Sequence, residues 1–225
     1  YRQFHQADFD IIGESDPVVD AQTIQVIFAV LTELGLKGLS VHINSIGDKS
    51  CWEKYREELK LYYRNKAGRL CKNCKKRLKE NPMRMLDCKE DECVALKSSV
   101  PNSVDYLDKS CHDHFKLVLE FLDELNVPYI LDPYLVRGLD YYTRTVFEII
   151  PENASGSQIT LASGGRYDYL ISQLGGKPAP AVGGSIGIER TVNEMRRQDI
   201  KVNAIKPRTR VFLAQLGDLA KKKSL

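Results

Sequence analysis

The sequence predicts an α+β fold in which strands and amphipathic helices are interleaved and a long, mostly helical stretch interrupts them. Three observations support this class. The first residues alternate between polar and apolar side chains, as a half-buried strand does. Residues 18–31 repeat apolar side chains at helical spacing. Residues 141–162 contain two strand-like runs around a turn of Pro, Asn, Gly and Ser, which indicates an antiparallel pair.

The first strand is expected between Tyr1 and Gly13, and its two faces differ in chemistry. One face carries Ala7, Phe9 and Ile11, and the other carries Arg2, Phe4, Gln6, Asp8 and Asp10. A face with four polar side chains is not expected to be buried in an apolar core. It either lies in solvent or forms the floor of a polar pocket, and the sequence leaves both possibilities open.

A helix is expected directly after this strand. The Ser-Asp-Pro sequence at residues 15–17 supplies a cap and a proline in the first turn, and the helical pattern continues to Gly35. Residues 39–43 are then typical of a short strand, which the Asn-Ser-Ile-Gly turn at residues 44–47 ends. Together these elements form the first part of a core, residues 1–47.

Residues 48–127 are expected to be a mostly helical insertion. Helical spacing predicts one helix over residues 49–65 and another from about Cys111 to Leu125. The insertion also carries the positive charge of the chain, because residues 53–97 contain 14 basic and 8 acidic side chains, whereas the rest has a net charge of −3. This basic surplus either faces nucleic acid or is a solvated helical surface.

The second part of the core is expected over residues 128–205, where more than half of the 15 glycines lie. The pattern predicts strands at Tyr141–Ile150, Gln158–Ala162 and Ala181–Ser185, a short helix at Tyr167–Leu174, and a helix at Gly187–Arg197. Arg210–Gln215 is typical of a first strand of a further domain, so residues 206–225 are expected to begin that domain.

Composition excludes two classes of protein. The 33 Lys and Arg exceed the 30 Asp and Glu by a formal charge of only +3, too little for a polycationic protein. The longest apolar run, Val26–Leu31, is far shorter than the roughly 20 residues of a membrane span, and no leader precedes it. We expect a soluble, cytoplasmic protein without a membrane partner. The start at Tyr1, in mid-strand, indicates part of a longer chain.

Two arginines stand where an anion could bind. Arg137 precedes a glycine and lies just before a strand that contains Tyr141 and Tyr142. Arg190 follows a glycine-rich run at the expected start of a helix, where the backbone approaches a ligand closely and the helix dipole favours an anion. A planar, permanently charged guanidinium suits phosphate well, so the two indicate a nucleotide-type ligand. Taken singly, each could be a surface or ion-paired residue.

Four segments resemble motifs of histidyl-tRNA synthetases, in that family's order. YRQFHQADFD at residues 1–10 resembles the second half of motif 2, and LVRGLDYYTRT at residues 135–145 resembles the family's own histidine motif. SGGRYD at residues 163–168 is similar to its second histidine motif, and GGSIGIER at residues 183–190 is similar to motif 3 of class II synthetases. The matches cover nearly the whole chain.

The resemblance implies a class II fold, an antiparallel sheet flanked by helices, that activates histidine with ATP and Mg²⁺ and transfers it to the 3′ end of histidine tRNA. It implies that histidine is bound by Gln6, Asp10, Tyr141, Tyr142 and Tyr167, and ATP by Phe4, Arg137 and Arg190. Arg137 is the expected catalytic residue. Many members of the family have glutamate where Asp10 stands. Motif 1, the dimer element of the family, and the first half of motif 2 are absent. We therefore expect the isolated chain to be inactive and its full-length parent to be a homodimer.

Four of the six cysteines are spaced as possible zinc ligands. Cys71-x2-Cys74-x13-Cys88-x4-Cys93 could supply four thiolates, and the alternative is four free thiols. Cys51 and Cys111 are expected to be buried apolar side chains. The four histidines, His5, His42, His112 and His114, are expected to be structural or surface residues.

Two other functions remain open at this point. A synthetase-like regulatory subunit could bind histidine as a sensor for histidine biosynthesis, although such relatives typically lack the insertion and the intact arginine motif. A nucleic-acid-binding module built on a zinc knuckle would not need the pocket around Gln6, Tyr142 and Tyr167.

Overall fold

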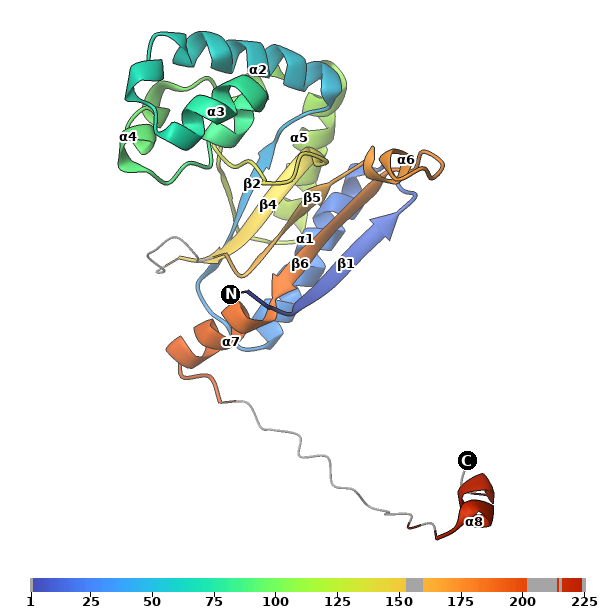
Figure 1. Ribbon diagram of the computed structural model, residues 1–225. Coiled ribbons are helices and arrows are strands. Elements are labelled where there is room, and N and C mark those ends of the chain that lie inside the picture. The colour runs from blue at the N-terminus through green and yellow to red at the C-terminus, as the bar shows by residue number, and fades with distance from the viewer. Residues whose placement is uncertain (1, 153–159, 202–213, 215, 224–225) are drawn as a thin grey trace.

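The computed structural model describes residues 2–152, 160–201, 214 and 216–223 (Figure 1). Six strands form one sheet in the order β1-β6-β5-β4-β2-β3. They are β1 (Gln6–Ile12), β2 (Leu39–Ser45), β3 (Tyr129–Leu131), β4 (Thr143–Pro151), β5 (Ala162–Arg166) and β6 (Ala181–Gly187). All neighbours are antiparallel except β2 and β3, which are parallel. The sheet with its helices confirms the predicted α+β class.

Two long helices cover one face of the sheet (Figure 1). Helix α1 (Pro17–Glu33) begins where predicted, because the Asp16 carboxylate caps it by accepting a hydrogen bond from the Val18 N–H at 2.9 Å. Helix α5 (Lys109–Glu124) packs beside α1, and their apolar side chains join Phe147 and Ile149 of β4 in the main core. The C-terminal elements are α6 (Leu170–Gln173), α7 (Ile188–Arg197) and α8 (Asp218–Lys223).

Residues 48–108 form a helical lobe beyond one end of the sheet (Figure 1). It consists of α2 (Lys49–Arg64), η1 (Ala67–Arg69), α3 (Lys72–Glu80), η2 (Pro82–Met85), α4 (Asp91–Val94), η3 (Lys97–Ser99) and η4 (Ser103–Tyr106). The segment 48–127, predicted as a mostly helical insertion, contains these helices together with α5, which packs with the main core. A second core fills the lobe and includes Tyr142 and Val146 from the loop before β4 and from β4 itself.

Some predicted elements differ from those observed. The strand predicted at Gln158–Ala162 was wrong at residues 160 and 161, and residues 158 and 159 lie outside the described residues. Strand β5 runs instead from Ala162 to Arg166 and uses the two glycines of the SGGR sequence. A Cβ on Gly164 would lie 2.2 Å from the Gly183 oxygen, so the close approach of β5 to β6 requires glycine. Strand β1 begins at Gln6, β2 continues to Ser45, and β3 had no sequence prediction. The strand predicted at Arg210–Gln215 lies outside the described residues.

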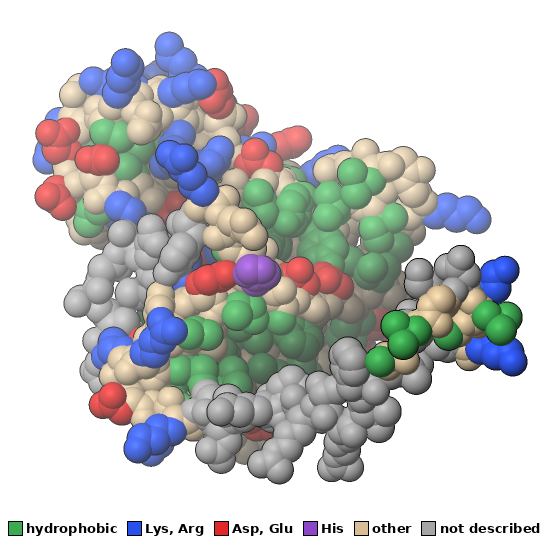
Figure 2. Space-filling view, turned by 60° about the horizontal axis from the view of Figure 1, so that its bottom comes forward, with side chains coloured by type: hydrophobic (Ala, Val, Ile, Leu, Met, Phe, Trp, Pro, Cys, Tyr) green, Lys and Arg blue, Asp and Glu red, His purple; other side chains and the backbone are tan. Residues whose placement is uncertain are grey.

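Charge is divided between the two parts of the molecule. Lys and Arg side chains are spread over the helical lobe among some Asp and Glu, and a row of Asp and Glu side chains lies on the body below it, which also carries Lys and Arg (Figure 2). In the part of the chain that the structure describes, no helix is long and apolar enough to cross a membrane.

Candidate active site

A cavity of about 440 Å³ opens on the sheet face opposite α1 and α5. Its lining combines segments from both ends of the chain: Phe4, Gln6, Arg137, Thr160, Leu161, Ser163, Ser185, Gly187, Glu189 and Arg190. Four residues predicted as site residues, Phe4, Gln6, Arg137 and Arg190, are therefore brought together. On the polar face of the first strand, Gln6 lines this cavity and is also exposed, so both alternatives that the sequence left open remain compatible with its position.

Strand register explains why polar groups meet at this cavity. Asp8 of β1 lies opposite Ser185 of β6, and Ser185 lies opposite Ser163 of β5. Ser163 in turn lies opposite Glu148 of β4. Directly opposed residues on paired strands project from the same face of a sheet. One row of polar side chains therefore crosses four strands, although its members are far apart in the sequence.

Arg137 lies at the edge of this row in the loop between β3 and β4, and its guanidinium is held from two sides. It donates hydrogen bonds to the Glu148 carboxylate and, at 2.8 Å, to the Ser163 hydroxyl. The same carboxylate also accepts a hydrogen bond from the Thr160 hydroxyl at 2.9 Å. The Nε–H of Arg137 is buried without a hydrogen-bond partner. A positioned cation with an unused donor suits an anionic ligand.

The far end of the cavity is built around α7. Arg190 donates a hydrogen bond to the Thr160 carbonyl at 3.0 Å. The neighbouring Glu189 carboxylate accepts the His5 backbone N–H at 3.0 and 2.9 Å and lies 2.7 Å from His5 Nδ1. The backbone hydrogen bond, followed by the ring contact, lowers the pKa of Glu189 to about 2. These contacts tie the first residues of the chain to the start of α7.

The remaining predicted histidine ligands form a separate group beside the cavity. The Tyr167 hydroxyl donates a hydrogen bond to the Asp10 carboxylate. The Tyr167 ring contacts those of Tyr141 and Tyr142, with centroids 6.0 and 6.5 Å apart. Burial raises the pKa of Tyr142 to about 12, an effect that Tyr141 adds to and Arg137 partly offsets. Burial also raises the pKa of Tyr167, and the Asp10 carboxylate adds to it. The phenols therefore stay neutral near pH 7.

Arg137 connects this tyrosine group to the cavity. A small second cavity has Arg137, Val136 and Tyr142 in its lining, so the guanidinium borders both. Asp10 fits beside β6 only because residue 183 is glycine: a Cβ there would lie 1.9 Å from the Asp10 Oδ1. The arrangement offers an anion site at the cavity and a polar, aromatic site next to it.

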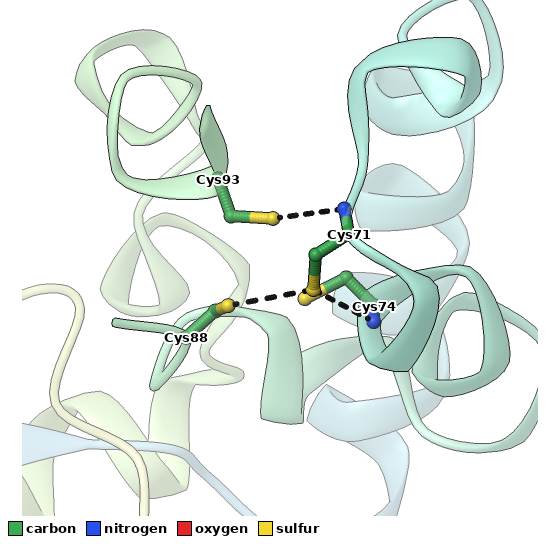
Figure 3. Close-up of side chains that lie close together, drawn as sticks. All are labelled: Cys71, Cys74, Cys88 and Cys93. Carbon is green, nitrogen blue, oxygen red and sulfur yellow. Dashed lines mark hydrogen bonds between the residues drawn. The ribbon is translucent and has the colours of Figure 1, made fainter. Parts of the chain in front are cut away.

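The four zinc-candidate cysteines also converge, in the helical lobe away from the cavity (Figure 3). All four Sγ atoms lie within 4.8 Å of one another, and those of Cys71 and Cys88 are 3.9 Å apart. Cys51 and Cys111 are buried, as predicted.

Comparison with known proteins identifies the family. The family model described as histidyl-tRNA synthetase matches residues 1–191. The chain belongs to the histidyl-tRNA synthetase family. It is 45% identical over 220 residues to a histidine–tRNA ligase of Dehalococcoides mccartyi, covering 98% of this chain and 52% of that protein. It is 43% identical over 225 residues to a histidine–tRNA ligase of Caldicellulosiruptor saccharolyticus, covering all of this chain and 53% of that protein.

A solved structure supports the same assignment. The apo histidyl-tRNA synthetase of S. aureus matches with a TM-score of 0.73 and 33% sequence identity, over all of this chain and 55% of that chain. The class II synthetase fold inferred from the motifs is therefore confirmed. The chain spans about half the length of the curated relatives that it matches.

Histidyl-tRNA synthetases use ATP and Mg²⁺, and the residues of this cavity fit both. Two guanidinium groups and the unused Arg137 Nε–H suit phosphate oxygens. Glu189 lines the cavity and Glu148 holds Arg137 beside it, and their carboxylate oxygens are the kind of ligand that Mg²⁺ prefers.

Sequence reasoning missed the residues that hold the arginines in place. Glu148 and Ser163 bond the Arg137 guanidinium, and the Thr160 carbonyl accepts a hydrogen bond from Arg190. None of the three had an assigned role. A signal for Glu148 was present, because it is the only acidic residue in β4. His42 was also left without a partner, and it lies 3.5 Å from the Asp132 carboxylate.

Proposed function

We propose that this chain is the main part of the catalytic domain of a histidine–tRNA ligase, which activates histidine with ATP and then transfers it to the 3′ end of histidine tRNA. The observation that carries this proposal is the position of Arg137, held by Glu148 and Ser163 between the cavity and the tyrosine group. Family membership supports the same reaction.

The two neighbouring sites would hold the two substrates. Tyr142 and Tyr167, as neutral phenols, would hydrogen-bond the imidazole of histidine, and Tyr141 would line its pocket. Gln6 and Asp10 project from the same face of β1 and would bind the polar part of the amino acid, with Asp10 facing its ammonium. In the cavity, Phe4 would stack on adenine and Arg190 would contact the γ-phosphate.

In the first step a carboxylate oxygen of histidine would attack the α-phosphorus of ATP. The new C–O–P bond forms as the bond from the α-phosphorus to the pyrophosphate oxygen breaks, and pyrophosphate leaves. Negative charge grows on the non-bridging oxygens, so a fixed Arg137 stabilises the transition state more than the ground state. Mg²⁺, when bound, would neutralise phosphate charge.

The test is histidine-dependent exchange of pyrophosphate into ATP, measured on the full-length protein. Arg137→Ala is expected to lower the exchange rate by about 10²- to 10³-fold, the usual cost of losing one such group. Arg137→Lys keeps the charge but loses the two-sided fork, so it should recover only part of the rate. Arg64→Ala, at the exposed end of α2, is the matched control.

Each outcome has a distinct meaning. Near-normal exchange by a folded Arg137→Ala protein would refute the catalytic role. Histidine binding without any exchange by the unmodified protein would favour the regulatory-subunit function instead. Absence of both histidine and ATP binding would favour a nucleic-acid-binding module.

Further parts of this proposal concern partners and metals. The exposed lysines of α3, Lys72, Lys75, Lys76 and Lys79, would face the acceptor stem of tRNA. The full-length protein would act as a homodimer in the cytoplasm. The second predicted metal, Zn²⁺, would be structural, because its cysteines do not line the cavity.

A further inference from the structure

The sulfur atoms of Cys71, Cys74, Cys88 and Cys93 are spaced as the ligands of one metal ion. Tetrahedral Zn²⁺ with Zn–S bonds of 2.3 Å places its sulfurs about 3.8 Å apart. The Sγ atoms of Cys71 and Cys88 are 3.9 Å apart, and all four lie within 4.8 Å of one another (Figure 3). They come from the start of α3, its first turn, the loop after η2, and α4. Four separate backbone positions therefore aim their sulfurs at one point.

Hydrogen bonds around these sulfurs indicate acceptors stronger than thiols. The Cys71 Sγ accepts the Cys74 N–H at 3.3 Å and so caps α3, a position that Ser, Thr, Asp or Asn usually occupies. The Cys93 Sγ accepts the Cys71 N–H at 3.4 Å. A thiol is a weak acceptor, whereas a metal-bound thiolate carries negative charge. Two N–H···S contacts of this kind suit a metal-bound cluster.

The charges nearby also suit such a cluster. Four thiolates around Zn²⁺ leave a net charge of −2. The Lys97 ammonium donates a hydrogen bond to the Cys88 carbonyl at 2.8 Å, and α3 carries four lysines and one arginine. The positive charges of Lys97 and of the α3 side chains would partly offset the negative charge of the zinc–thiolate cluster.

We propose that these four cysteines bind one structural Zn²⁺ ion, which closes the helical lobe and supports the loop that carries Arg137. On binding, each thiol gives up its proton to the solvent and no group is oxidised or reduced. The lobe needs such a cross-link, because α3, η2 and α4 have only 9, 4 and 4 residues. A metal ion would link these short helices in addition to the core that they share with α2.

A second cluster in the lobe has a different explanation. Asp48, Cys51, Asp108 and Cys111 also lie within 4.8 Å of one another. Here both carboxylates already cap helices: Asp48 accepts the Ser50 N–H at 2.9 Å, and Asp108 accepts the Cys111 N–H at 2.8 Å. Two helix starts that lie together account for this cluster without a metal. Its cysteines therefore serve as matched controls.

The link from the metal to the active-site loop is short. The Asn81 amide, between α3 and η2, donates a hydrogen bond to the Asp140 carboxylate at 2.6 Å. Met83 and Met85 of η2 belong to the same buried core as Cys74 and Cys88, and this core also contains Val136 and Tyr142. A lobe loosened by metal loss would therefore release the loop from 135 to 142. This second step rests on the proposed function, whereas zinc binding does not.

The first measurement is the zinc content of the full-length protein, purified under reducing conditions without added metal. We expect about one zinc per chain, the stoichiometry of a four-thiolate site. Cobalt exchanged into the protein should show the intense visible bands of tetrahedral cobalt thiolate. Cys88→Ser should lose the metal, whereas Cys51→Ala and Cys111→Ala should keep it.

A further pair of variants covers the case in which Cys88→Ser fails to fold. Cys71 is the most accessible of the four, and Cys71→Ser should lose zinc while Cys71→His should keep it, since three cysteines and one histidine also form zinc sites. Removing zinc from the unmodified protein with a chelator should lower its melting temperature and raise the KM for histidine.

Three results would overturn the site. They are a folded protein with no zinc and four titratable thiols, disulfides among these cysteines, or zinc that Cys51→Ala removes and Cys88→Ser does not. If the protein binds zinc but its KM for histidine does not change when the zinc is removed, the metal site stands and only its support of the loop is refuted. Zinc present in a protein without histidine-dependent exchange would refute the proposed function and leave the metal site standing.

Discussion

At the scale of single residues, a fully buried ion pair lies outside the cavity lining. Arg166 and Asp20 are both fully buried, and their side chains form a bidentate pair that joins β5 to α1. The remaining Arg166 donors bond the Glu14 and Asp16 carbonyls and the Asp168 carboxylate. His114 of α5 lies 3.4 Å from the same Asp20 carboxylate. Every donor of this buried cation therefore has an acceptor.

Removing one partner of this pair should be strongly destabilising. Asp20→Asn removes the fully buried charge partner of Arg166 and leaves only the partly exposed Asp168 carboxylate, and breaking a buried pair typically costs about 3–5 kcal/mol in the free energy of unfolding. Urea denaturation measures it. Asp113→Asn, which breaks the exposed pair with Lys109, should leave the stability almost unchanged, because solvent screens exposed ion pairs. Equal effects of the two substitutions would contradict the importance of burial.

The same pair predicts a pH dependence. Burial opposes ionisation of Asp20, but the hydrogen bonds from His114 and Arg166 outweigh it and hold its pKa below the ordinary 3.8. Because the pKa of Asp20 is lower in the folded protein than in the unfolded protein, its ionised form stabilises the fold at pH values above the unfolded-state pKa. This stabilisation is lost as the pH falls through the folded-state pKa. The stability difference between the unmodified protein and Asp20→Asn should therefore be full at neutral pH and shrink below about pH 4.

At the scale of elements, glycines set how closely the strands of the site approach one another. Gly165 of β5 lies opposite Gly183 of β6, which lies opposite Asp10 of β1. A Cβ on Gly165 would lie 2.4 Å from the Thr145 oxygen and 3.0 Å from the Tyr142 ring. The bare backbone of these two strands makes room for the Asp10 carboxylate and the tyrosine group.

Gly183→Ala tests this packing in the full-length protein. The new methyl group would meet the Asp10 carboxylate at 1.9 Å and the Phe9 carbonyl at 2.8 Å, so β1 or Asp10 must move. We expect kcat/KM for histidine activation to fall by about 10²-fold, the usual effect of a 1 Å misplacement in a site. Gly68→Ala, where a Cβ meets nothing within 4 Å, is the control and should leave kcat/KM unchanged.

Elements with local signals could be predicted, and those defined by pairing could not. Helix α1 followed from the Asp16 cap and Pro17, which act within one turn. Strand β3 has only three residues and depends on pairing with β2, so no period marks it. β5 was displaced because glycine normally argues against a strand, and only the opposing β6 explains it. The motifs identified the site residues, but Glu148 and Ser163 gained significance only when the strands brought them to Arg137.

At the scale of the whole molecule, the chain consists of a sheet body and a helical lobe, each with its own hydrophobic core and a different balance of charged side chains. The lobe shares its core with β4 and with the loop before it, so the two parts are joined beside Arg137 and Tyr142. The lobe holds the surplus of Lys and Arg over Asp and Glu, and a row of acidic side chains lies on the body (Figure 2). Nucleic acid would therefore be attracted to the lobe and not to the sheet.

Charge reversal on α3 tests that attraction. Converting Lys72, Lys75 and Lys79 to Glu in the full-length protein should weaken histidine tRNA binding and flatten its dependence on salt, because fewer counterions are released. Pyrophosphate exchange, which needs no tRNA, should be unchanged. Lys109→Glu and Lys116→Glu on α5 are the controls. Unchanged binding and salt dependence would mean that the lysines are only a solvated surface.

The strand order has a consequence for synthesis on the ribosome. β1 emerges well before its neighbour in the sheet, β6, although Gln6 pairs with Gly187. Contacts in the helical lobe connect residues much closer in sequence, and local contacts form faster than distant ones. The lobe is therefore expected to fold before β6 has been translated and can pair with β1. A chaperone that holds exposed strands would act on β1 during this interval.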